Sequence, residues 1–543
     1  MDNFQPLYAL VGVAVLYVVY RRFTRISLAD IRGPEPENYL IGNMRQLQQG
    51  IAGVPDFEWT NAYGGIVHLK APFGEDKLLV SDPKALQYIL STSGYNFTKS
   101  PDRRELTRIL IGEGLIFVEG DDHKRHRKVM LPAFGGPESK ALFPIFRSTV
   151  QQLMELWKDS ISNDGGQSSV LNVPFWLGRA TLDAIGEAAF DYKFGALDGS
   201  DSELGPAYNN LFSDAFALPS TLKIFIQSAT KYIPIPVIRA AYNKLPVESL
   251  KRIRGTSDLA NKVAKDLVET KGEALLHGKA SRDVMTLLVK ANASTNAKAQ
   301  LSEIEMLSQM RTLMLAGHET SGNSLTWTLW ELAKNPQMQS RLRDEIRSVE
   351  RNVRQRGDTD FTLADIEGMS YLQAVLKESL RFNPVVLHMF REPLKDDVLP
   401  LFKPIMTYSG KLVHEVPIPA GTRLILSISA YNRDPDIWGP DSHTFNPDRW
   451  LTGHGKENNG PSIGVVGNLL TFSSGIRSCI GWRFAMVEMQ TFLADLVNNF
   501  EFALTEESKK ITRQAALVMV PMVGGKLDEG AQLPLAVSIA PRD

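Results

Sequence analysis

The single cysteine of this chain limits its possible folds more than any other feature. Cys479 is the only cysteine among 543 residues, so the chain can form neither an intramolecular disulfide nor a cysteine-rich zinc site, while His and carboxylate metal sites stay open. Stability must come from a hydrophobic core, for which a hydrophobic content of 43% is sufficient. A net charge of −1 with 22% charged residues argues against a nucleic-acid-binding protein and against a largely disordered chain.

The N-terminus is expected to anchor the protein in a membrane. Residues 4–20 read FQPLYALVGVAVLYVVY, which as a helix would be about 26 Å long, slightly less than the hydrocarbon core of a bilayer. The alternatives are a cleaved signal peptide and a buried helix. A signal peptide carries positive charge before its apolar run, whereas here Asp2 precedes the run and arginines follow it. We therefore expect residues 1–25 to be a single membrane anchor, with the rest of the chain on the cytoplasmic side.

The remainder of the chain, residues 46–543, is predicted to be one helix-dominated domain of the mainly α, α+β class. It follows a proline-containing linker, residues 26–45. Apolar periodicity predicts a long helix over residues 301–334, and residues 336–356 predict a charged amphipathic helix. Residues 451–470 are expected to form a surface loop. The short segments that resemble strands are residues 64–70, 77–80, 423–430 and 515–523.

One further segment, residues 220–242, is unusually apolar but contains Lys223, Lys231 and Arg239. It is expected either to be buried or to lie against a membrane surface, where it would admit lipophilic substrates.

The residues around the cysteine suit a reactive thiolate. Gly475 and Gly481 allow the backbone to turn tightly and to approach a flat group. Arg477 precedes the sulfur by two residues and can meet an anion. A helix is predicted to begin just after the cysteine, and its N-terminal N–H groups favour an anionic sulfur. The plain alternative is that Cys479 is a small buried hydrophobic residue.

The segment FSSGIRSCIG resembles the haem-binding loop of the cytochrome P450 family. The defining positions that match are Phe472, Gly475, Arg477, Cys479 and Gly481. The resemblance implies that Cys479 is the axial thiolate ligand of the iron of haem b, a ligand that favours O–O cleavage. It further implies that Phe472 packs beside the sulfur and that Arg477 pairs with a haem propionate. The implied fold is helix-rich with small β-sheets, and holds the haem between a long central helix and the cysteine loop.

The segment AGHETS, residues 316–321, places an acid and an alcohol side by side within the predicted long helix. Glu319 and Thr320 could relay protons, or they could be a solvated glutamate and a threonine bonded back to its own helix. Together with the cysteine loop, the segment resembles the oxygen-activation motif of the same family, which implies that Thr320 and Glu319 are catalytic.

A structural network is also implied. Glu378 and Arg381 are three residues apart, so a helix would place them on one face. A surface salt bridge of little energetic value is the alternative. The pair resembles the glutamate–arginine pair of the family, and Arg449 in FNPDRW is similar to its usual third partner. A buried, fully satisfied network of this kind would stabilise the core.

Other basic residues match positions that bind haem propionates or a redox partner in the family. Arg391 and Arg127 are implied to bind propionates, and His123 stands where the family usually has tryptophan. The same predicted helix carries three further basic residues, Lys124, Arg125 and Lys128. The resemblance implies that this helix docks an electron-donating flavoprotein, for which positive charge is favourable; a solvated basic helix is the alternative.

The resemblance implies a haem-thiolate monooxygenase of the microsomal type found in fungi. Such an enzyme inserts one oxygen atom of O₂ into a lipophilic substrate, with electrons from NADPH through cytochrome P450 reductase and with cytochrome b5 as a second candidate donor. It would be a single-pass protein of the endoplasmic reticulum membrane, active in secondary metabolite biosynthesis or xenobiotic oxidation.

The substrate pocket is implied to be apolar, with only His388 nearby as a polar group. The residues implied to line it are Phe117, Leu313, Ala316, Val385, Val386, Leu387 and Met522. A terpenoid, sterol, fatty acyl or polycyclic aromatic substrate would suit such a pocket.

Two other functions are compatible with the same motifs. The first is a haem-thiolate isomerase or dehydratase that needs no O₂, against which the intact Glu319–Thr320 pair argues. The second is a non-catalytic haem protein, such as a sensor or an electron carrier, against which an apolar pocket argues.

Overall fold

The computed structural model describes residue 12 and residues 26–199, 207, 216–276, 283–294, 296, 299–452 and 460–542. The expected membrane anchor, residues 1–25, lies outside the described residues apart from Gly12. Among the residues that the structure describes, no helix is both long enough and apolar enough to cross a bilayer.

Helices dominate the described chain, which confirms the predicted class. The helices are α2 (Met44–Gln49), α3 (Val54–Tyr63), α4 (Pro83–Gln87), α5 (Pro101–Ile111), α6 (Gly120–Met130), α7 (Gly136–Ala141), α8 (Phe143–Asn163), α9 (Val173–Phe190), α12 (Thr221–Ala229), α13 (Ile235–Lys244), α14 (Glu248–Leu276), α15 (Val284–Ser294), α16 (Glu303–Lys334), α17 (Pro336–Gln355), α18 (Leu363–Gly368), α19 (Ser370–Phe382), α20 (Ile428–Asn432), α21 (Pro435–Trp438) and α22 (Trp482–Asn499).

The strands are short. They are β1 (Ile66–Ala71), β2 (Glu75–Val80), β3 (Phe97–Thr98), β4 (Ser168–Asn172), β5 (His388–Pro393), β6 (Asp397–Met406), β7 (Leu412–Ile418), β8 (Arg423–Ser427), β9 (Phe500–Leu504), β10 (Ile511–Ala515), β11 (Met519–Val523) and β12 (Pro534–Ile539). They form a five-stranded sheet in the order β1-β2-β8-β5-β3, a three-stranded sheet in the order β4-β12-β9, and the hairpins β6-β7 and β10-β11. The β2–β8 pair is parallel and its neighbours are antiparallel.

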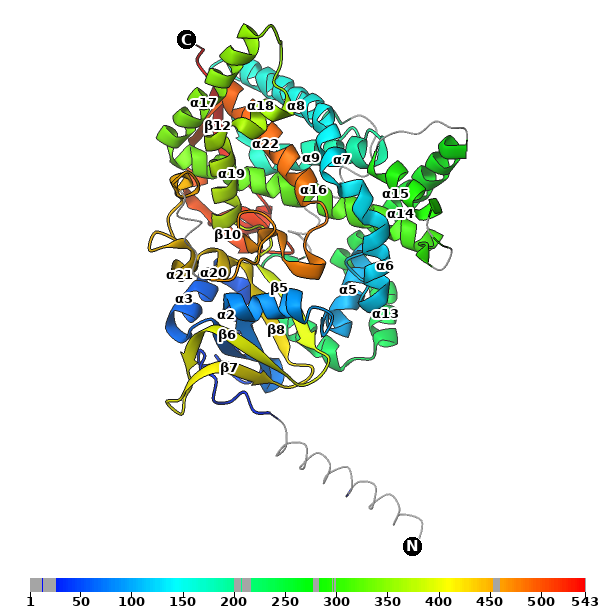
Figure 1. Ribbon diagram of the computed structural model, residues 1–543, viewed down its shortest axis with the longest axis vertical. Helices are drawn as coiled ribbons and strands as arrows, with labels where there is room; N and C mark the ends of the chain where they lie inside the picture. Colours follow the sequence, from blue (N-terminus) through cyan, green and yellow to red (C-terminus); the bar gives the residue numbers. More distant parts are fainter. Residues whose placement is uncertain are drawn as a thin grey trace.

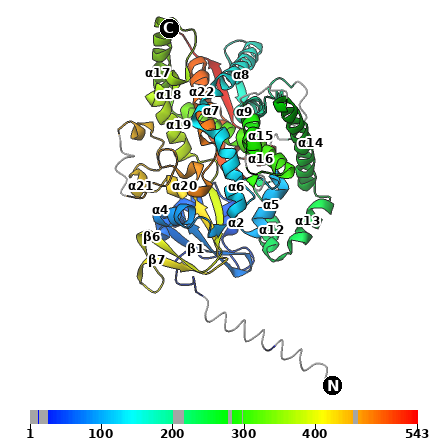
Figure 2. The same ribbon diagram turned by 45° about the vertical axis from the view of Figure 1, so that its right-hand side comes forward.

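The five-stranded sheet lies to one side of the helices. Figure 1 shows β5 and β8 of this sheet in the lower part of the molecule, near the separate β6-β7 hairpin, with the longer helices above them, and Figure 2 shows β1 in the same lower part. Helix α16 runs through the middle of the helical part, and α22 crosses in front of it in Figure 1. The site described below lies where these helices meet the edge of the sheet.

Helix α16 is long because its start is well capped and its middle is buried. Ser302 and Glu305 form a capping box, which satisfies N–H groups at the N-terminus. Further along, α16 packs closely on α9. A Cβ added at Gly317 would lie 2.7 Å from the side chain of Ile185, and the hydroxyl of Thr181 donates to the carbonyl of His318 at 2.9 Å.

Most of the predicted strands and helices are present in the structure, although their ends differ from the predicted ones. The helices predicted over residues 301–334 and 336–356 are α16 and α17, and the strand segments correspond to β1, β2, β8 and the β10-β11 hairpin. The segment expected to be a strand to residue 430 ends at Ser427, because the Ser427 hydroxyl accepts from the N–H of Ala430 and caps α20. Residues 453–459 of the expected loop lie outside the described residues.

The expected linker, residues 26–45, is held against the sheet. It contains no helix or strand before α2 begins at Met44. Leu28, Ile31 and Ile41 are buried, and the carbonyl of Arg32 accepts from the N–H of His68 on β1 at 2.9 Å. The described part of this segment therefore packs as part of the domain rather than standing free of it.

The apolar segment at residues 220–242 forms α12 and α13, which are mostly exposed. Ile224 is the buried apolar residue of α12, whereas α13 buries none of its residues. The large apolar side chains that this segment exposes are Leu222, Ile226, Tyr232, Ile233 and Val237. Of the two alternatives for this segment, burial is therefore wrong for these side chains.

Candidate functional site: a cysteine facing a buried cavity

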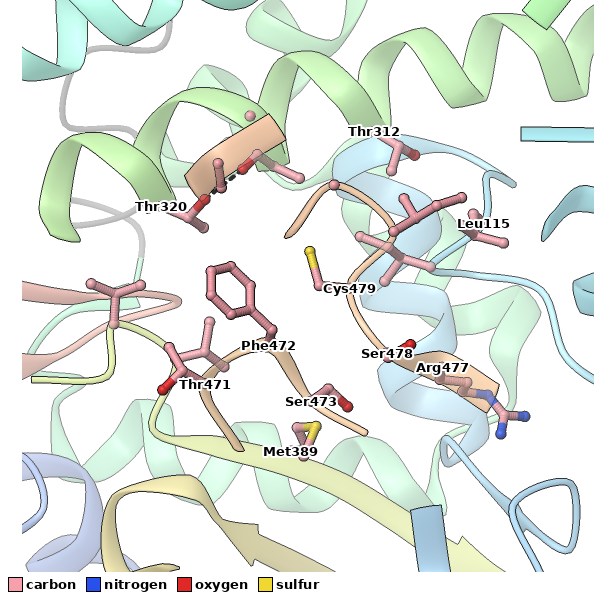
Figure 3. A pocket seen from close by; sticks show the side chains of 18 of the residues that line it. Leu115, Thr312, Thr320, Met389, Thr471, Phe472, Ser473, Arg477, Ser478 and Cys479 are labelled. Atoms are coloured by element: carbon pink, nitrogen blue, oxygen red, sulfur yellow. Dashed lines mark hydrogen bonds between the residues drawn. The ribbon is translucent and has the colours of Figure 1, made fainter. Parts of the chain in front are cut away.

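A cavity of about 490 Å³ lies between α16, α5, α6, β5 and the loop that carries the cysteine. Its wall is mostly apolar, with residues such as Leu110, Leu313, Val386 and Phe472. Cys479 exposes its side chain, although protein surrounds the sulfur, because the exposed surface faces the cavity. Figure 3 shows the sulfur and the ring of Phe472 pointing into the same space, with Thr320 of α16 opposite.

The cysteine loop is fixed by its own backbone. The N–H of Cys479 donates to the carbonyl of Phe472 at 2.8 Å, which closes the loop. Gly475 has a φ of 61°, and a Cβ there would lie only 2.2 Å from the carbonyl oxygen of Leu90. Only glycine fits this position, because both the backbone conformation and the neighbouring chain exclude a side chain. Gly481 is different, since its φ is −90° and an added Cβ would approach no atom within 3.8 Å.

The sulfur has a mixed electrostatic environment. Burial raises the pKa of the Cys479 thiol, while the N–H of Gly481 and the charge of Arg127 lower it. Helix α22 begins at Trp482, as predicted, but its N-terminus and Arg127 do not outweigh burial. A bound metal ion deprotonates a coordinating thiol, so this sulfur suits a metal ligand better than a free thiolate.

Of the predicted acid and alcohol of α16, only the alcohol borders the cavity. Thr320 borders the cavity, and its hydroxyl donates to the carbonyl of Ala316 at 2.8 Å. This is the bond back to the helix that was considered as the alternative, and it leaves the oxygen lone pairs available. Glu319 is partly buried and does not border the cavity. Thr320 is thus placed to contact a ligand in the cavity directly, and Glu319 is not.

Cations gather at one end of the cavity. Arg477 donates to the carbonyl of Gly94 at 2.7 Å and forms an ion pair with Glu119, which also pairs with Lys99 at 2.6 Å. The Nε of Arg477 is buried and has no hydrogen-bond partner within the described residues. Burial lowers the pKa of Lys99 to about 8. Burial and the charge of Arg477 lower the pKa of Arg391 to about 10.

Helix α6 contributes two more nitrogen-bearing side chains to this end. Arg127 donates to the carbonyl of Ser478 at 2.8 Å and to its hydroxyl at 3.1 Å. His123 is buried, and its Nδ1 lies 3.1 Å from the hydroxyl of Tyr95. Burial and the charges of Arg477 and neighbouring cations lower the pKa of His123 to about 4, so it is neutral at pH 7.

No carboxylate of the described residues borders the cavity, whereas five permanently or mostly charged basic side chains do. They are Lys99, Arg103, Arg127, Arg391 and Arg477. A cavity with an apolar wall, a sulfur and an excess of positive charge suits a ligand that is largely apolar and carries anionic groups.

The structure brings together the three residues of the predicted structural network. Arg381 donates to both oxygens of Glu378 at 2.8 and 2.9 Å, and Arg449 donates to the same carboxylate at 3.2 Å. The indole of Trp450 adds a bond at 3.0 Å. Glu378, Arg381 and Arg449 are all buried, and carbonyl groups of Asn432 and nearby residues accept the remaining guanidinium protons. The pair is therefore no surface salt bridge.

The pocket residues implied by the resemblance are only partly in the cavity wall. Those that border the cavity are Leu313, Ala316, Val385 and Val386. Leu387 and Met522 do not border the cavity and belong to the buried cluster around Trp327, which also includes Val385. The ring of Phe117 lies under Arg104 at 4.8 Å. His388 also does not border the cavity, since its Nε2 faces the carboxylate of Asp56 at 2.6 Å.

Several lining residues were not predicted from the sequence. They include Lys99, Arg103, Leu106, Leu110, Met389, Phe390 and Leu517. The spacing of Leu106 and Leu110, one helical turn apart, was the available signal for the inner face of α5. No local pattern indicated that Arg103 of the same helix faces the cavity as well.

The chain belongs to the cytochrome P450 family, a family of haem-thiolate monooxygenases. The model of the family described as Cytochrome P450 matches residues 32–527. Similar proteins include cytochrome P450 monooxygenase 128 of Postia placenta, 34% identical over 94% of this chain and 92% of its own. Cytochrome P450 monooxygenase claQ of Ampulloclitocybe clavipes is 32% identical over 96% of this chain and 95% of its own. The ganoderic acid synthetase CYP5150L8 of Ganoderma lucidum is 31% identical over 93% of this chain and 94% of its own.

The cavity fits the haem-thiolate iron that this family implies. The sulfur of Cys479 is exposed to the cavity, and Gly475 lets the loop lie close to its neighbours. The unpartnered Nε of Arg477 and the excess of cations match the propionate carboxylates of haem. The apolar remainder of the wall matches the porphyrin ring.

Proposed function

We propose that this enzyme inserts one oxygen atom of O₂ into a lipophilic substrate, with electrons that originate from NADPH. The observation that carries the proposal is that Cys479 and Thr320 face one apolar cavity from opposite sides. Haem with an axial thiolate supplies O₂ activation. In this proposal Cys479 ligates the iron, and Arg477, Arg391, Arg127 and His123 bind the propionates.

The roles proposed for the residues of the chain follow from their positions. The Phe472 ring shields the sulfur from water on one side. The hydroxyl of Thr320 accepts and donates protons at the cavity wall. Glu319 precedes Thr320 in the chain and does not border the cavity. We therefore propose that it passes protons to Thr320 rather than to the ligand. If the Tyr95 hydroxyl donates to Nδ1 of His123, then Nε2 of His123 holds the proton and is the donor to a propionate.

A carbon monoxide difference spectrum of the reduced, haem-loaded protein tests the ligation. Wild type should give the strongly red-shifted Soret band of thiolate-ligated haem, and Cys479→Ser should not. A wild-type protein with a full haem complement but no such band contradicts thiolate ligation and the monooxygenase function with it. Turnover without O₂ or NADPH would favour an isomerase or dehydratase instead.

We propose that cytochrome P450 reductase donates the electrons, with cytochrome b5 as a second candidate, and that α6 is part of the docking surface. Arg125 is tied to Glu305 and Asp122, so the exposed positive charges on this helix are those of Lys124, which pairs with the exposed Asp121 at 2.8 Å, and Lys128. Lys124→Glu with Lys128→Glu should slow reduction by the flavoprotein and weaken its dependence on salt, because steering by charge is screened by ions. Reduction by dithionite should stay unchanged, as the internal control.

We further propose that the protein is bound to the endoplasmic reticulum membrane and takes its substrate from the lipid. The exposed apolar side chains of α12 and α13, with Leu222 at 67% and Val237 at 54% exposed, support contact with a bilayer. Hydrogen exchange of residues 221–244 should slow in lipid vesicles relative to detergent, and exchange of β4 should not. Equal exchange in both media would contradict this orientation.

We also propose that the enzyme serves secondary metabolism or xenobiotic oxidation. The likeness to the ganoderic acid synthetase supports the first of these roles.

A further inference from the structure

One cation in the cavity wall has no hydrogen-bond or ion-pair partner among the residues that the structure describes. Arg103 on α5 is partly buried and borders the cavity. Within the described part of the chain, its guanidinium makes no hydrogen bond and no ion pair. The guanidinium carbon lies 3.3 Å from the centre of the Phe390 ring, which supports it but does not neutralise its charge. The adjacent carboxylate, Asp102, is occupied by Arg423 at 2.8 Å.

Arg103 is electrostatically separate from the cluster that fits the haem propionates. In that cluster, the charge of Arg477 acts on both Lys99 and Arg391 and lowers the pKa of each. The charges that interact with Arg103 are those of Asp102, Arg423 and Lys77, none of which belongs to that cluster. Burial lowers the pKa of Arg103 to about 10, which still leaves it cationic at pH 7. The cavity thus has a second positive position outside the cluster.

The wall near Arg103 along α5 is aliphatic. Leu106 and Leu110 border the cavity from the same helix. Thr107 also borders it, and its hydroxyl donates to the carbonyl of Arg103 at 3.0 Å, so only its lone pairs remain free. A ligand that suits this wall has an apolar body and one anionic group. A phosphate would bring more negative charge than one guanidinium can offset, whereas a carboxylate matches its planar pair of donors.

We propose that the substrate is a lipophilic carboxylic acid and that Arg103 binds its carboxylate. The inference rests on the proposed function, and it narrows the substrate class to apolar molecules that carry one acid group. Arg103 then fixes the orientation of the substrate in the cavity and so decides which carbon is oxidised. An apolar molecule without the acid would leave this cation unpaired, which is costly in a cavity of low polarity.

The test uses the full-length, haem-loaded protein and the shift of the Soret band on ligand binding. The probes are palmitic acid and oleanolic acid, each compared with its methyl ester, which keeps the apolar body and removes the charge. Wild type should bind at least one acid about 10- to 100-fold more tightly than its ester, which is the range for a charge-assisted hydrogen bond. Arg103→Gln should lose this preference, and Arg103→Lys should keep part of it.

Arg104→Gln is the matched control, because Arg104 is the next residue of α5 but does not border the cavity. It should keep the preference for the acid. The carbon monoxide spectrum and the haem content are measured on every preparation. If wild type binds neither acid more tightly than its ester, the inference is wrong. A red-shifted carbon monoxide band in the same preparation then shows that this result does not contradict the proposed function. An Arg103→Gln protein that loses haem also overturns the inference, because Arg103 would then belong to the propionate site.

Discussion

The buried carboxyl group of Glu488 leads to a quantitative prediction about stability and pH. Glu488 lies on α22 and is fully buried, and within the described residues neither of its oxygens has a hydrogen-bond partner. Burial raises its pKa from 4.5 to about 8, and the nearby hydroxyl of Ser321 has a smaller effect in the opposite direction. The group is therefore protonated in the folded protein at neutral pH.

The direction of the pH effect follows from this raised pKa. The unfolded chain releases the proton above about pH 4.5, whereas the folded chain keeps it until about pH 8. The folded state therefore loses stability as the pH rises through this window, by about 3 to 4 kcal/mol between pH 5 and pH 8. The entropy of unfolding of a chain of 543 residues is about 1.1 kcal/mol/K. The loss thus corresponds to about 3 °C in the unfolding temperature.

Glu488→Gln removes the titration and nearly keeps the shape. We expect the unfolding temperature of the variant, relative to wild type, to rise by about 3 °C between pH 5 and pH 8. Differential scanning fluorimetry over this range measures the difference, and the other titrating groups cancel because both proteins share them. Glu58→Gln, at an exposed position of α3, is the control and should show a constant difference. A constant difference for Glu488→Gln as well would refute the assignment of a neutral buried acid.

Three further predictions concern the loop, the network and the alcohol. Gly475→Ala should lower the unfolding temperature and the haem content strongly, because of its positive φ and the carbonyl 2.2 Å from the new Cβ, whereas Gly481→Ala should keep the fold. Glu378→Ala should cost about 3–5 kcal/mol, or about 3–4 °C in the unfolding temperature, because it leaves buried arginines unpaired; Glu367→Ala, at an exposed ion pair, should cost less than about 1 kcal/mol. Thr320→Val should keep substrate binding but lower the amount of product formed per NADPH consumed, and it should slow product formation by about 100-fold. An unchanged ratio of product to NADPH would show that Thr320 does not take part in proton transfer.

The parts of this protein that could be predicted from sequence are those whose cause is local. The cysteine loop needs Gly475 at one backbone position, and the long helix needs apolar periodicity and a capping residue, so both leave a trace in adjacent residues. The five-stranded sheet leaves no such trace. It joins β1 and β2 to strands more than three hundred residues later, such as β8, and no local pattern specifies which strands meet. Similarly, Leu387 and Met522 are apolar, as pocket residues are, but they pack around Trp327. Their position is determined by tertiary packing alone.

Arg103 and Arg477 show why a sequence motif predicts the proposed cofactor site better than the proposed substrate site. Both arginines border one cavity. Arg477 lies two residues from Cys479, so its position relative to the proposed metal ligand is fixed by the same loop and can be recognised from the spacing. Arg103 comes from α5, and it reaches the cavity only because α5 packs beside α16 and β5 carries Phe390 beneath it. Cys479 and Arg477, two of the groups proposed to hold the cofactor, are thus connected through the backbone of one loop, whereas Arg103, proposed to bind the substrate, is brought to the cavity by the packing of several elements. A change in α5 can therefore alter the substrate while the cysteine loop stays as it is.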